Sequence, residues 1–221
     1  MASTALPDHL FVCCNAQGSS AEPLLELGLT EGSSRIHPGQ GTRNRKFYFQ
    51  KSFLELLWVH NAAEAQSALT APTRLWERSQ FQSSGFSRFG LCVAGKLPNA
   101  LERLLNHGHD YRPEYLPAGA AIRMVTMEQA PSLPMLFALP DGFGYQPGKE
   151  PTEHATGMQR VSKLVFSVLA EDAEHELAKA IQALDFVEIA VDAKPQLLVE
   201  FDDAQQGRET QLPELDLTLR W

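Results

Sequence analysis

Two side chains that can move protons or bind metal ions, His9 and Glu55, stand in apolar runs near the N-terminus. Glu55 lies within Leu54–Leu57, and an apolar strand tolerates a lone carboxylate poorly, because burying an unpaired charge is expensive. Glu55 therefore needs a partner, a metal ion or a water-filled cavity. With His9 as that partner, it would bind a metal ion or form an acid–base couple. The alternative is a buried hydrogen-bonded pair that only orders the strands.

A glycine-rich polar turn, His37–Asn44, lies between these two residues in the sequence. Its glycines, Gly39 and Gly41, could turn backbone N–H groups toward a ligand. Basic residues are concentrated around it in an acidic chain: Arg35, His37, Arg43, Arg45 and Lys46. This favours an anionic small molecule, such as a carboxylate or a phosphate ester. The alternative is a solvated turn whose glycines serve only its geometry.

The cysteines and the other histidines give weaker signals. Cys13 and Cys92 occupy matching places in two apolar runs and are expected to be small buried residues. The sequence places no histidine or basic side chain beside either of them, so a nucleophilic role is not predicted. His154 is expected to position a connecting segment. The remaining histidines are expected at the surface or at a helix end, where they can cap carbonyls or lie in water.

Length and charge narrow the class of protein. The chain has 221 residues and a net charge of −8, which argues against a nucleic-acid partner. No apolar run approaches the roughly eighteen residues of a membrane span, and no signal peptide is evident. Three sparse cysteines fit reduced thiols. These features predict a soluble cytoplasmic protein without a membrane partner.

The pattern of apolar runs repeats a unit of strand, helix and further strands three times. The expected strands are 10–14, 46–50 and 53–59, then 89–94, 121–127 and 133–139, then 161–169, 187–191, 196–201 and 215–221. Helices are expected between Ser19 and Gly28, from Pro98 to Gly108, and through 173–184. Two connectors, 61–86 and 140–158, separate the copies. Repetition at this level predicts an α+β fold of repeated modules.

The early histidine, the string His37-Pro38-Gly39-Gln40-Gly41-Thr42-Arg43-Asn44 and the run Leu54-Glu55-Leu56-Leu57 resemble the vicinal oxygen chelate superfamily. Within it, the chain is most similar to the glyoxalase-like domain proteins, over about residues 7–140. The resemblance implies two βαβββ modules whose sheets curl into a half-open cup. It also implies metal ligands on the first and last strands of both modules, which here would be His9 and Glu55.

The second module departs from that pattern. Gly90 stands at the position that corresponds to His9, and the last strand, Met135–Leu139, is apolar. Two protein ligands are fewer than the three or four of a tight divalent site. A bound divalent metal ion is therefore left open.

The resemblance and the residues together give these expectations. Residues 1–140 would form a glyoxalase-like domain of paired modules, at about 7–60 and 88–140, around a small-molecule cavity. Residues 141–159 would form a connector loop, and 160–221 a third, diverged βαββ(β) unit packed on the first two.

The expected function is that of a glyoxalase-like enzyme acting on a small, anionic, oxygen-bearing substrate. Its type, whether lyase, isomerase or dioxygenase, is left open. His9 and Glu55 would be catalytic, and His37, Asn44 and Arg43 would bind substrate. The alternatives are a non-enzymatic binding or sequestering protein on the same fold and, more weakly, a structural module. A homodimer is left open.

Overall fold

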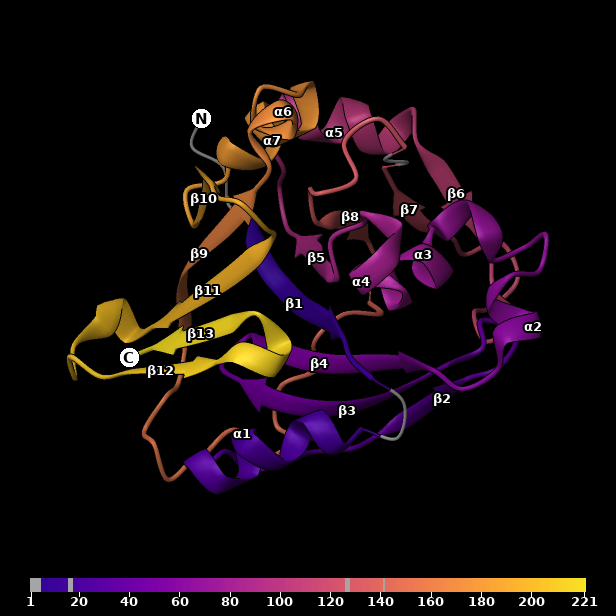
Figure 1. The fold of residues 1–221 in the computed structure, drawn as a ribbon. Coiled ribbons are helices and arrows are strands. Elements are labelled where there is room, and N and C mark those ends of the chain that lie inside the picture. The colour runs from indigo at the N-terminus through magenta and orange to yellow at the C-terminus, as the bar shows by residue number, and fades with distance from the viewer. Residues whose placement is uncertain (1–4, 16–17, 126–127, 141) are drawn as a thin grey trace.

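The computed structural model describes residues 5–15, 18–125, 128–140 and 142–221. Their strands form two mixed sheets (Figure 1). The larger, eight-stranded sheet has the order β2-β3-β4-β1-β5-β8-β7-β6, and the smaller, five-stranded sheet has the order β10-β9-β11-β13-β12. The larger sheet curls, and the smaller sheet lies beside it on the left of Figure 1.

The first module contributes half of the larger sheet. Its elements are β1 (Leu6–Cys13), η1 (Ser19–Ala21), α1 (Glu22–Leu27), β2 (Arg35–His37), β3 (Thr42–Phe49) and β4 (Ser52–Val59). Helix α1 ends at Gly28, whose φ of 100° favours glycine. Strands β3 and β4 form a tight hairpin, and β4 then pairs in parallel with β1. The last strand of the module therefore lies beside its first strand.

The second module repeats this arrangement and completes the larger sheet. It is preceded by short helices, namely α2 (Ala62–Ala65), η2 (Ala71–Thr73), α3 (Leu75–Ser79) and α4 (Phe81–Ser84). Its own elements are β5 (Phe89–Ala94), α5 (Asn99–Asn106), β6 (His109–Tyr111), β7 (Ile122–Met124) and β8 (Met135–Ala138). Strand β5 pairs in parallel with β8 and antiparallel with β1, so β1 and β5 join the modules. The strand predicted at 121–127 ends in residues 126 and 127, which lie outside the described ranges.

The C-terminal unit uses similar elements with a different pairing. They are β9 (Val161–Val168), α6 (Ala170–Ala173), α7 (Glu176–Gln182), β10 (Val187–Val191), β11 (Gln196–Phe201), η3 (Asp202–Ala204), β12 (Glu209–Leu212), η4 (Pro213–Leu215) and β13 (Leu217–Arg220). Strand β9 lies between β10, parallel to it, and β11, antiparallel to it. In this unit β10, the strand that follows the helices, pairs in parallel with the first strand. In the first two modules the last strand does so. The α+β fold of repeated modules with a diverged third unit is confirmed.

Two clusters of buried side chains lie on opposite faces of the larger sheet. Leu10 and Val12 of β1 belong to the large core, which also includes Leu164 and Phe166 of β9. Phe11 and Cys13 of β1 belong to a smaller cluster on the other face, as strand alternation predicts. Helices α5 and α7 cover part of the large core together (Figure 1).

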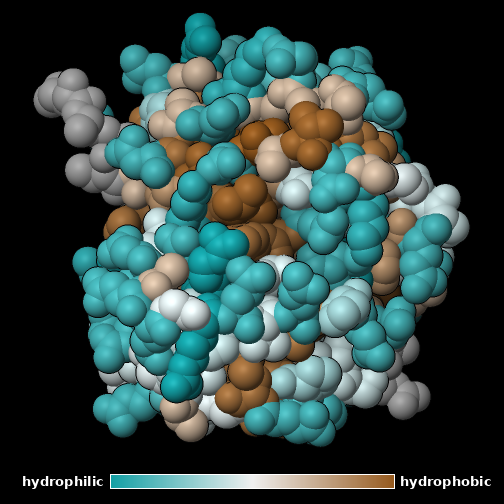
Figure 2. Space-filling model, turned by 60° about the vertical axis from the view of Figure 1, so that its left-hand side comes forward, coloured by the Kyte–Doolittle hydropathy of each residue, from teal (hydrophilic) through white to brown (hydrophobic). Residues whose placement is uncertain are grey.

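The face of the molecule that carries the smaller sheet is mainly hydrophilic (Figure 2). Apolar residues reach the surface there in the middle and upper part of the face and in a smaller patch near the bottom. Among the described residues, no helix is long and apolar enough to cross a membrane.

Candidate functional site

The concave face of the larger sheet encloses a cavity of about 310 Å³. Polar side chains of β1 to β4 line one half of it, including His9, Asn44 and Glu55. The half formed by β7 and β8 is apolar, with Met124 and Phe137 among its lining residues. A cavity of this size, with polar groups converging on one wall, suits a small molecule.

Glu55 is buried in the polar wall, with 6% of its surface exposed. Strand β4 places it on the concave face, and its Oε1 accepts a hydrogen bond of 2.5 Å from Asn44 Nδ2. Asn44 is held in turn because its Oδ1 accepts a hydrogen bond of 2.6 Å from the backbone N–H of Arg35. The amide therefore fixes the orientation of the carboxylate.

His9 faces the second carboxylate oxygen of Glu55. Its Nε2 lies 3.9 Å from Glu55 Oε2, which is too long for a hydrogen bond. The ring stacks on Phe53, with centroids 4.4 Å apart and planes 6° apart, and meets the edge of Phe137. The gap between the two polar atoms leaves both available to a bound molecule.

Asp8 holds the other nitrogen of His9. His9 Nδ1 donates a hydrogen bond of 2.6 Å to Asp8 Oδ1, since an ionised carboxylate can only accept. The pairing of β1 with β5 shifts register between Pro7 and His9, and such a bulge can redirect a side chain. This irregularity accounts for two neighbouring residues of one strand reaching each other. No sequence pattern indicates this contact between Asp8 and His9.

The electrostatics of this pair favour a protonated His9. Burial opposes the charged imidazolium, but the sulfur of Cys92 and the Asp8 carboxylate together raise the pKa of His9 well above its ordinary value. Burial also opposes the charged form of Asp8, yet the interactions with His9 and the N–H of Tyr145 hold the pKa of Asp8 below its ordinary value.

Cys92 is the residue directly opposite His9 on the neighbouring strand β5. The expectation that no histidine stands beside it is therefore wrong, because strand register is a non-local property. Burial raises the pKa of the Cys92 thiol, although His9 opposes the shift. Cys92 is fully buried and lies behind the cavity wall, so it is placed to hold the ring of His9 and not to attack a substrate.

The glycine-rich turn places His37 at the cavity but uses its glycines for geometry. Gly39 N–H donates to Glu64 Oε2 at 2.8 Å, so it is not directed at a ligand. At Gly41 a Cβ would lie 2.3 Å from the carbonyl oxygen of Asn61, and only glycine fits. His37 Nδ1 lies 2.9 Å from Thr42 Oγ1, and burial lowers the pKa of His37 below its ordinary value.

Arg43, in contrast, does not line the cavity. It neighbours Asn44 on β3, and alternation turns it to the opposite face, where its guanidinium lies 5.9 Å from the Trp58 ring centroid. The arginine and lysine residues that line the cavity are Arg35, Lys46 and Lys149. The sequence had grouped these arginines by closeness in the chain, which cannot separate the two faces of a strand.

Two of these basic side chains make cation–π contacts with aromatic rings. Arg35 lies 5.0 Å from the centroid of Tyr115, and Lys46 Nζ lies 5.3 Å from that of Tyr48. Among the residues that the structure describes, neither makes an ion pair, although the charge of Lys46 acts on Glu150. Both cations can therefore contribute to the attraction of an anion at the cavity wall.

The residues present do not fit the divalent site that the superfamily implies. In the described part of the chain, one group of three potential ligands occurs: Asp8, His9 and Cys92. Asp8 is already used, because it binds His9 Nδ1 with one oxygen and the N–H of Tyr145 with the other, and burial raises the pKa of the Cys92 thiol, which disfavours the thiolate that a metal ion needs. The second module offers no carboxylate or histidine on β5 or β8, and the ring of Phe11 fills the space above Gly90.

A half-open cup made of two βαβββ modules defines a glyoxalase-type small-molecule enzyme or binder. The glyoxalase-like domain family matches residues 8–182, and the chain belongs to this family. The predicted resemblance is thereby confirmed. No curated protein matches the sequence.

The solved structures that match the chain are distant in sequence. A hypothetical protein from Staphylococcus aureus matches with a TM-score of 0.59 and 8% identity, over 98% of both chains. A xylose isomerase-like TIM barrel/4-hydroxyphenylpyruvate dioxygenase fusion protein has a TM-score of 0.49 and 10% identity, over 92% of this chain and 37% of its own. A hypothetical protein from Bacillus halodurans C-125 has a TM-score of 0.39 and 13% identity, over 65% of this chain and 99% of its own.

Proposed function

We propose that this chain is a lyase- or isomerase-type enzyme that moves a proton on a small anionic substrate bound in the cup. Glu55 acts as the base, and His9, held protonated, donates from Nε2 to the substrate oxygen on which negative charge develops. His37 and Asn44 orient the substrate and the base. The observation that carries the proposal is the buried Glu55 carboxylate, fixed by Asn44 and facing His9 across 3.9 Å in the cavity wall.

The charge of the cavity supports an anionic substrate. Arg35, Lys46 and Lys149 line it together with the carboxylates of Glu55 and Glu150, and His9 adds a further positive charge when protonated. This local positive excess belongs to a chain whose net charge is −8. An anion would be attracted to the cavity more strongly than to the rest of the surface.

The proposed chemistry uses only protein side chains. The polar wall supplies a base and a donor, whereas a dioxygenase would need a metal-ligand set that these residues do not offer. A 2-oxo acid is the simplest molecule that combines an anionic group with an acidic C–H bond beside a carbonyl. Glu55 would remove that proton, and His9 would stabilise the enolate oxygen.

The second candidate function is binding without catalysis. It is favoured by the apolar half of the cavity, where Met124, Met135 and Phe137 offer contact but no reactive group. A binder would use the same cations and rings and would leave the C–H bonds of its ligand untouched.

Two measurements on the full chain test the proposal. Thermal-shift and calorimetric titrations compare pyruvate and 2-oxobutyrate with their amides, and the carboxylates should bind at least about tenfold more tightly. Proton NMR in D₂O then follows exchange of the C3 protons. Exchange should be catalysed by the wild type and reduced about 100-fold or more in Glu55→Gln.

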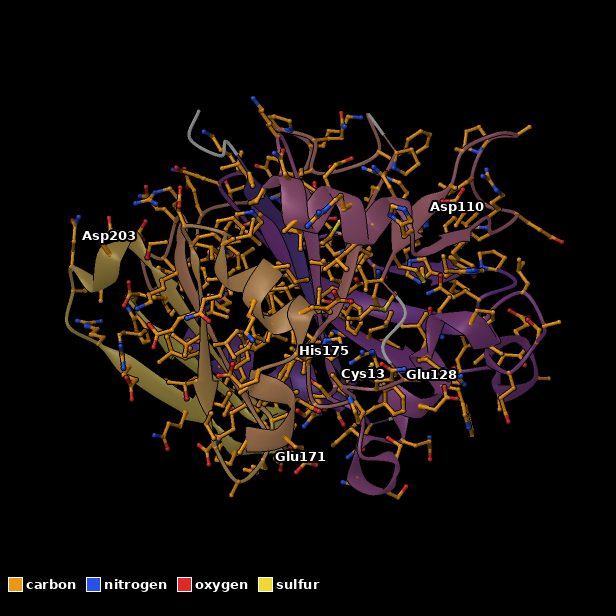
Figure 3. All side chains as sticks on the ribbon, turned by 90° about the horizontal axis from the view of Figure 1, so that it is seen from above. Cys13, Asp110, Glu128, Glu171, His175 and Asp203 are labelled. Atoms are coloured by element: carbon orange, nitrogen blue, oxygen red, sulfur yellow. The ribbon has the colours of Figure 1, made fainter. Side chains whose placement is uncertain are left out.

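Glu171→Gln is the matched control, because Glu171 is an exposed residue of α6 at the edge of the molecule (Figure 3). It should keep both binding and exchange. Carboxylate binding without catalysed exchange would reject the enzyme and support the binder. Failure of all carboxylates to bind would reject both functions.

A further inference from the structure

The segment that follows β8 passes over the mouth of the cavity. Phe143, Tyr145, Gln146, Lys149 and Glu150 all line it, although they come from a loop with no sheet pairing. The far end of this loop, 142–150, is fastened to the first module, because Glu150 accepts hydrogen bonds from the N–H and the hydroxyl of Ser33 at 2.9 and 2.5 Å.

The near end of the loop is fastened to Asp8. Tyr145 N–H donates a hydrogen bond of 2.8 Å to Asp8 Oδ2, while Asp8 Oδ1 accepts from His9 Nδ1 at 2.6 Å. The loop backbone also packs directly on the carboxylate, since a Cβ at Gly144 would lie 2.1 Å from Asp8 Oδ2. Asp8 is 5% exposed and does not itself line the cavity.

We infer that Asp8 is a positioning residue that couples loop 142–150 to His9. One carboxylate oxygen fixes the imidazole and its charge, and the other holds the loop over the cavity. Displacement of the loop would remove a hydrogen bond from the carboxylate and admit water to it, which weakens its hold on the imidazolium. The inference rests on the proposed function for its meaning, because His9 is the proposed donor to the substrate.

The other groups around His9 do not provide this connection. Glu55 of β4 lies 3.9 Å from Nε2, and Cys92 of β5 is its buried cross-strand neighbour. Phe53 and Phe137 pack against the ring, and at His37 burial and the charge of His9 both lower the pKa. Among the described residues that interact with His9, Asp8 is the one with a hydrogen bond to loop 142–150, since Cys92 meets the backbone of Leu139, which precedes the loop.

The test is the titration of the His9 ring in the ¹⁵N-labelled full chain, without any ligand. The His9 signal is assigned by its loss in His9→Gln. Gly144→Ala changes only the loop and should weaken proton binding by His9 about tenfold, because the added methyl group displaces the backbone from Asp8. Amide exchange of Tyr145 should become faster in the same variant.

Two more variants make the outcome decisive. Asp8→Asn removes the negative charge and should lower proton affinity of His9 at least as much, with faster exchange at Tyr145. Pro147→Ala, an exposed change in the same loop, should alter neither. A wild-type His9 titration in Gly144→Ala, or wild-type Tyr145 exchange in Asp8→Asn, would overturn the inference. A shifted titration in a protein that fails to bind carboxylates would instead reject the proposed function and retain the coupling.

Discussion

The chemistry of the cavity depends on single residues that neighbouring side chains hold in place. Glu55 is an acceptor of fixed orientation because Asn44 donates to it, and His9 is held in place because its Nδ1 donates to Asp8. Asn44 reaches Glu55 from the neighbouring strand β3, whereas Asp8 precedes His9 on β1, where the register shift in the pairing with β5 brings the two side chains together. The polar centre is therefore a product of strand pairing, and it lies on one side of the cup only.

Gly90 explains why the second module does not complete the centre. It lies opposite Phe11 in the pairing of β1 with β5, and the Phe11 ring occupies the space where a larger residue would project. A Cβ at Gly90 would lie 2.0 Å from Cε1 of Phe11. A ligand or acid at this position is excluded by packing as well as by sequence.

Gly90→Ala should consequently destabilise the protein by about 1–3 kcal/mol, the usual cost of overpacking a core. Urea denaturation followed by circular dichroism measures the free energy of unfolding. Phe11→Leu should cost less in the Gly90→Ala background than in the wild type, because the smaller side chain relieves the clash. Additive effects of the two substitutions would contradict this account.

At the scale of elements, the sequence predicted what local pattern determines. The apolar runs located β1, β3 to β5 and β9 to β11, and Gly28 and Gly108 marked helix ends near those observed. The three-residue strands β2 and β6 were missed because they are too short to show alternation. Strand β12 was also missed, since its residues are mostly exposed and carry no apolar run.

The parts of the site that escaped prediction are those that depend on pairing between distant segments. Cys92 stands beside His9 only through the register of β1 with β5. Arg43 was grouped with Asn44 by sequence, and the two faces of β3 separate them. The division into residues 1–140, 141–159 and 160–221 stays a prediction, and the family match extends through the connector to residue 182.

The connector is fixed to the first module by His154. Its Nδ1 accepts a hydrogen bond of 3.0 Å from the N–H of Thr30, and its Nε2 donates one of 2.8 Å to the carbonyl of Tyr48. Burial lowers the pKa of His154 below its ordinary value, although the bond to Tyr48 opposes this. The folded protein therefore requires the neutral imidazole here.

The sign of the pH effect follows from this lowered pKa. Below the ordinary histidine value the unfolded chain binds the proton more readily, so the contribution of His154 to stability is lost as the pH falls. His154→Phe should be less stable than the wild type by about 2 kcal/mol at about pH 7.5, and by less at about pH 5.5.

Urea denaturation at both pH values measures this difference. His60→Phe, at an exposed position, is the control and should show little difference from the wild type at either pH. An equal loss of stability in His154→Phe at both pH values would show that His154 acts through packing alone.

At the scale of the whole molecule, Arg88 connects the three repeated units. It immediately precedes β5, its Nε donates to the carbonyl of Cys13 in β1, and its Nη1 donates to the carbonyl of Glu214 and to Asp216 Oδ2. Arg88 is 3% exposed, so these acceptors are needed to stabilise its buried positive charge. The large core is also continuous from β1 to β9, so the units are expected to unfold together.

Asp216→Asn should therefore destabilise the whole molecule by on the order of 2 kcal/mol, because a buried guanidinium loses its counter-charge. Asparagine tolerates the φ of 49° at this position, so the backbone is not strained. Asp203→Asn is the matched control, since Asp203 has a φ of 56° and an exposed ion pair with Arg160 at the edge of the molecule (Figure 3).

Urea transitions followed by circular dichroism and by tryptophan fluorescence should coincide in both variants, at a lower midpoint only in Asp216→Asn. Equal midpoints in Asp216→Asn and Asp203→Asn would show that Arg88 does not connect the units. Separate transitions by circular dichroism and fluorescence would mean that the smaller sheet unfolds independently of the cup.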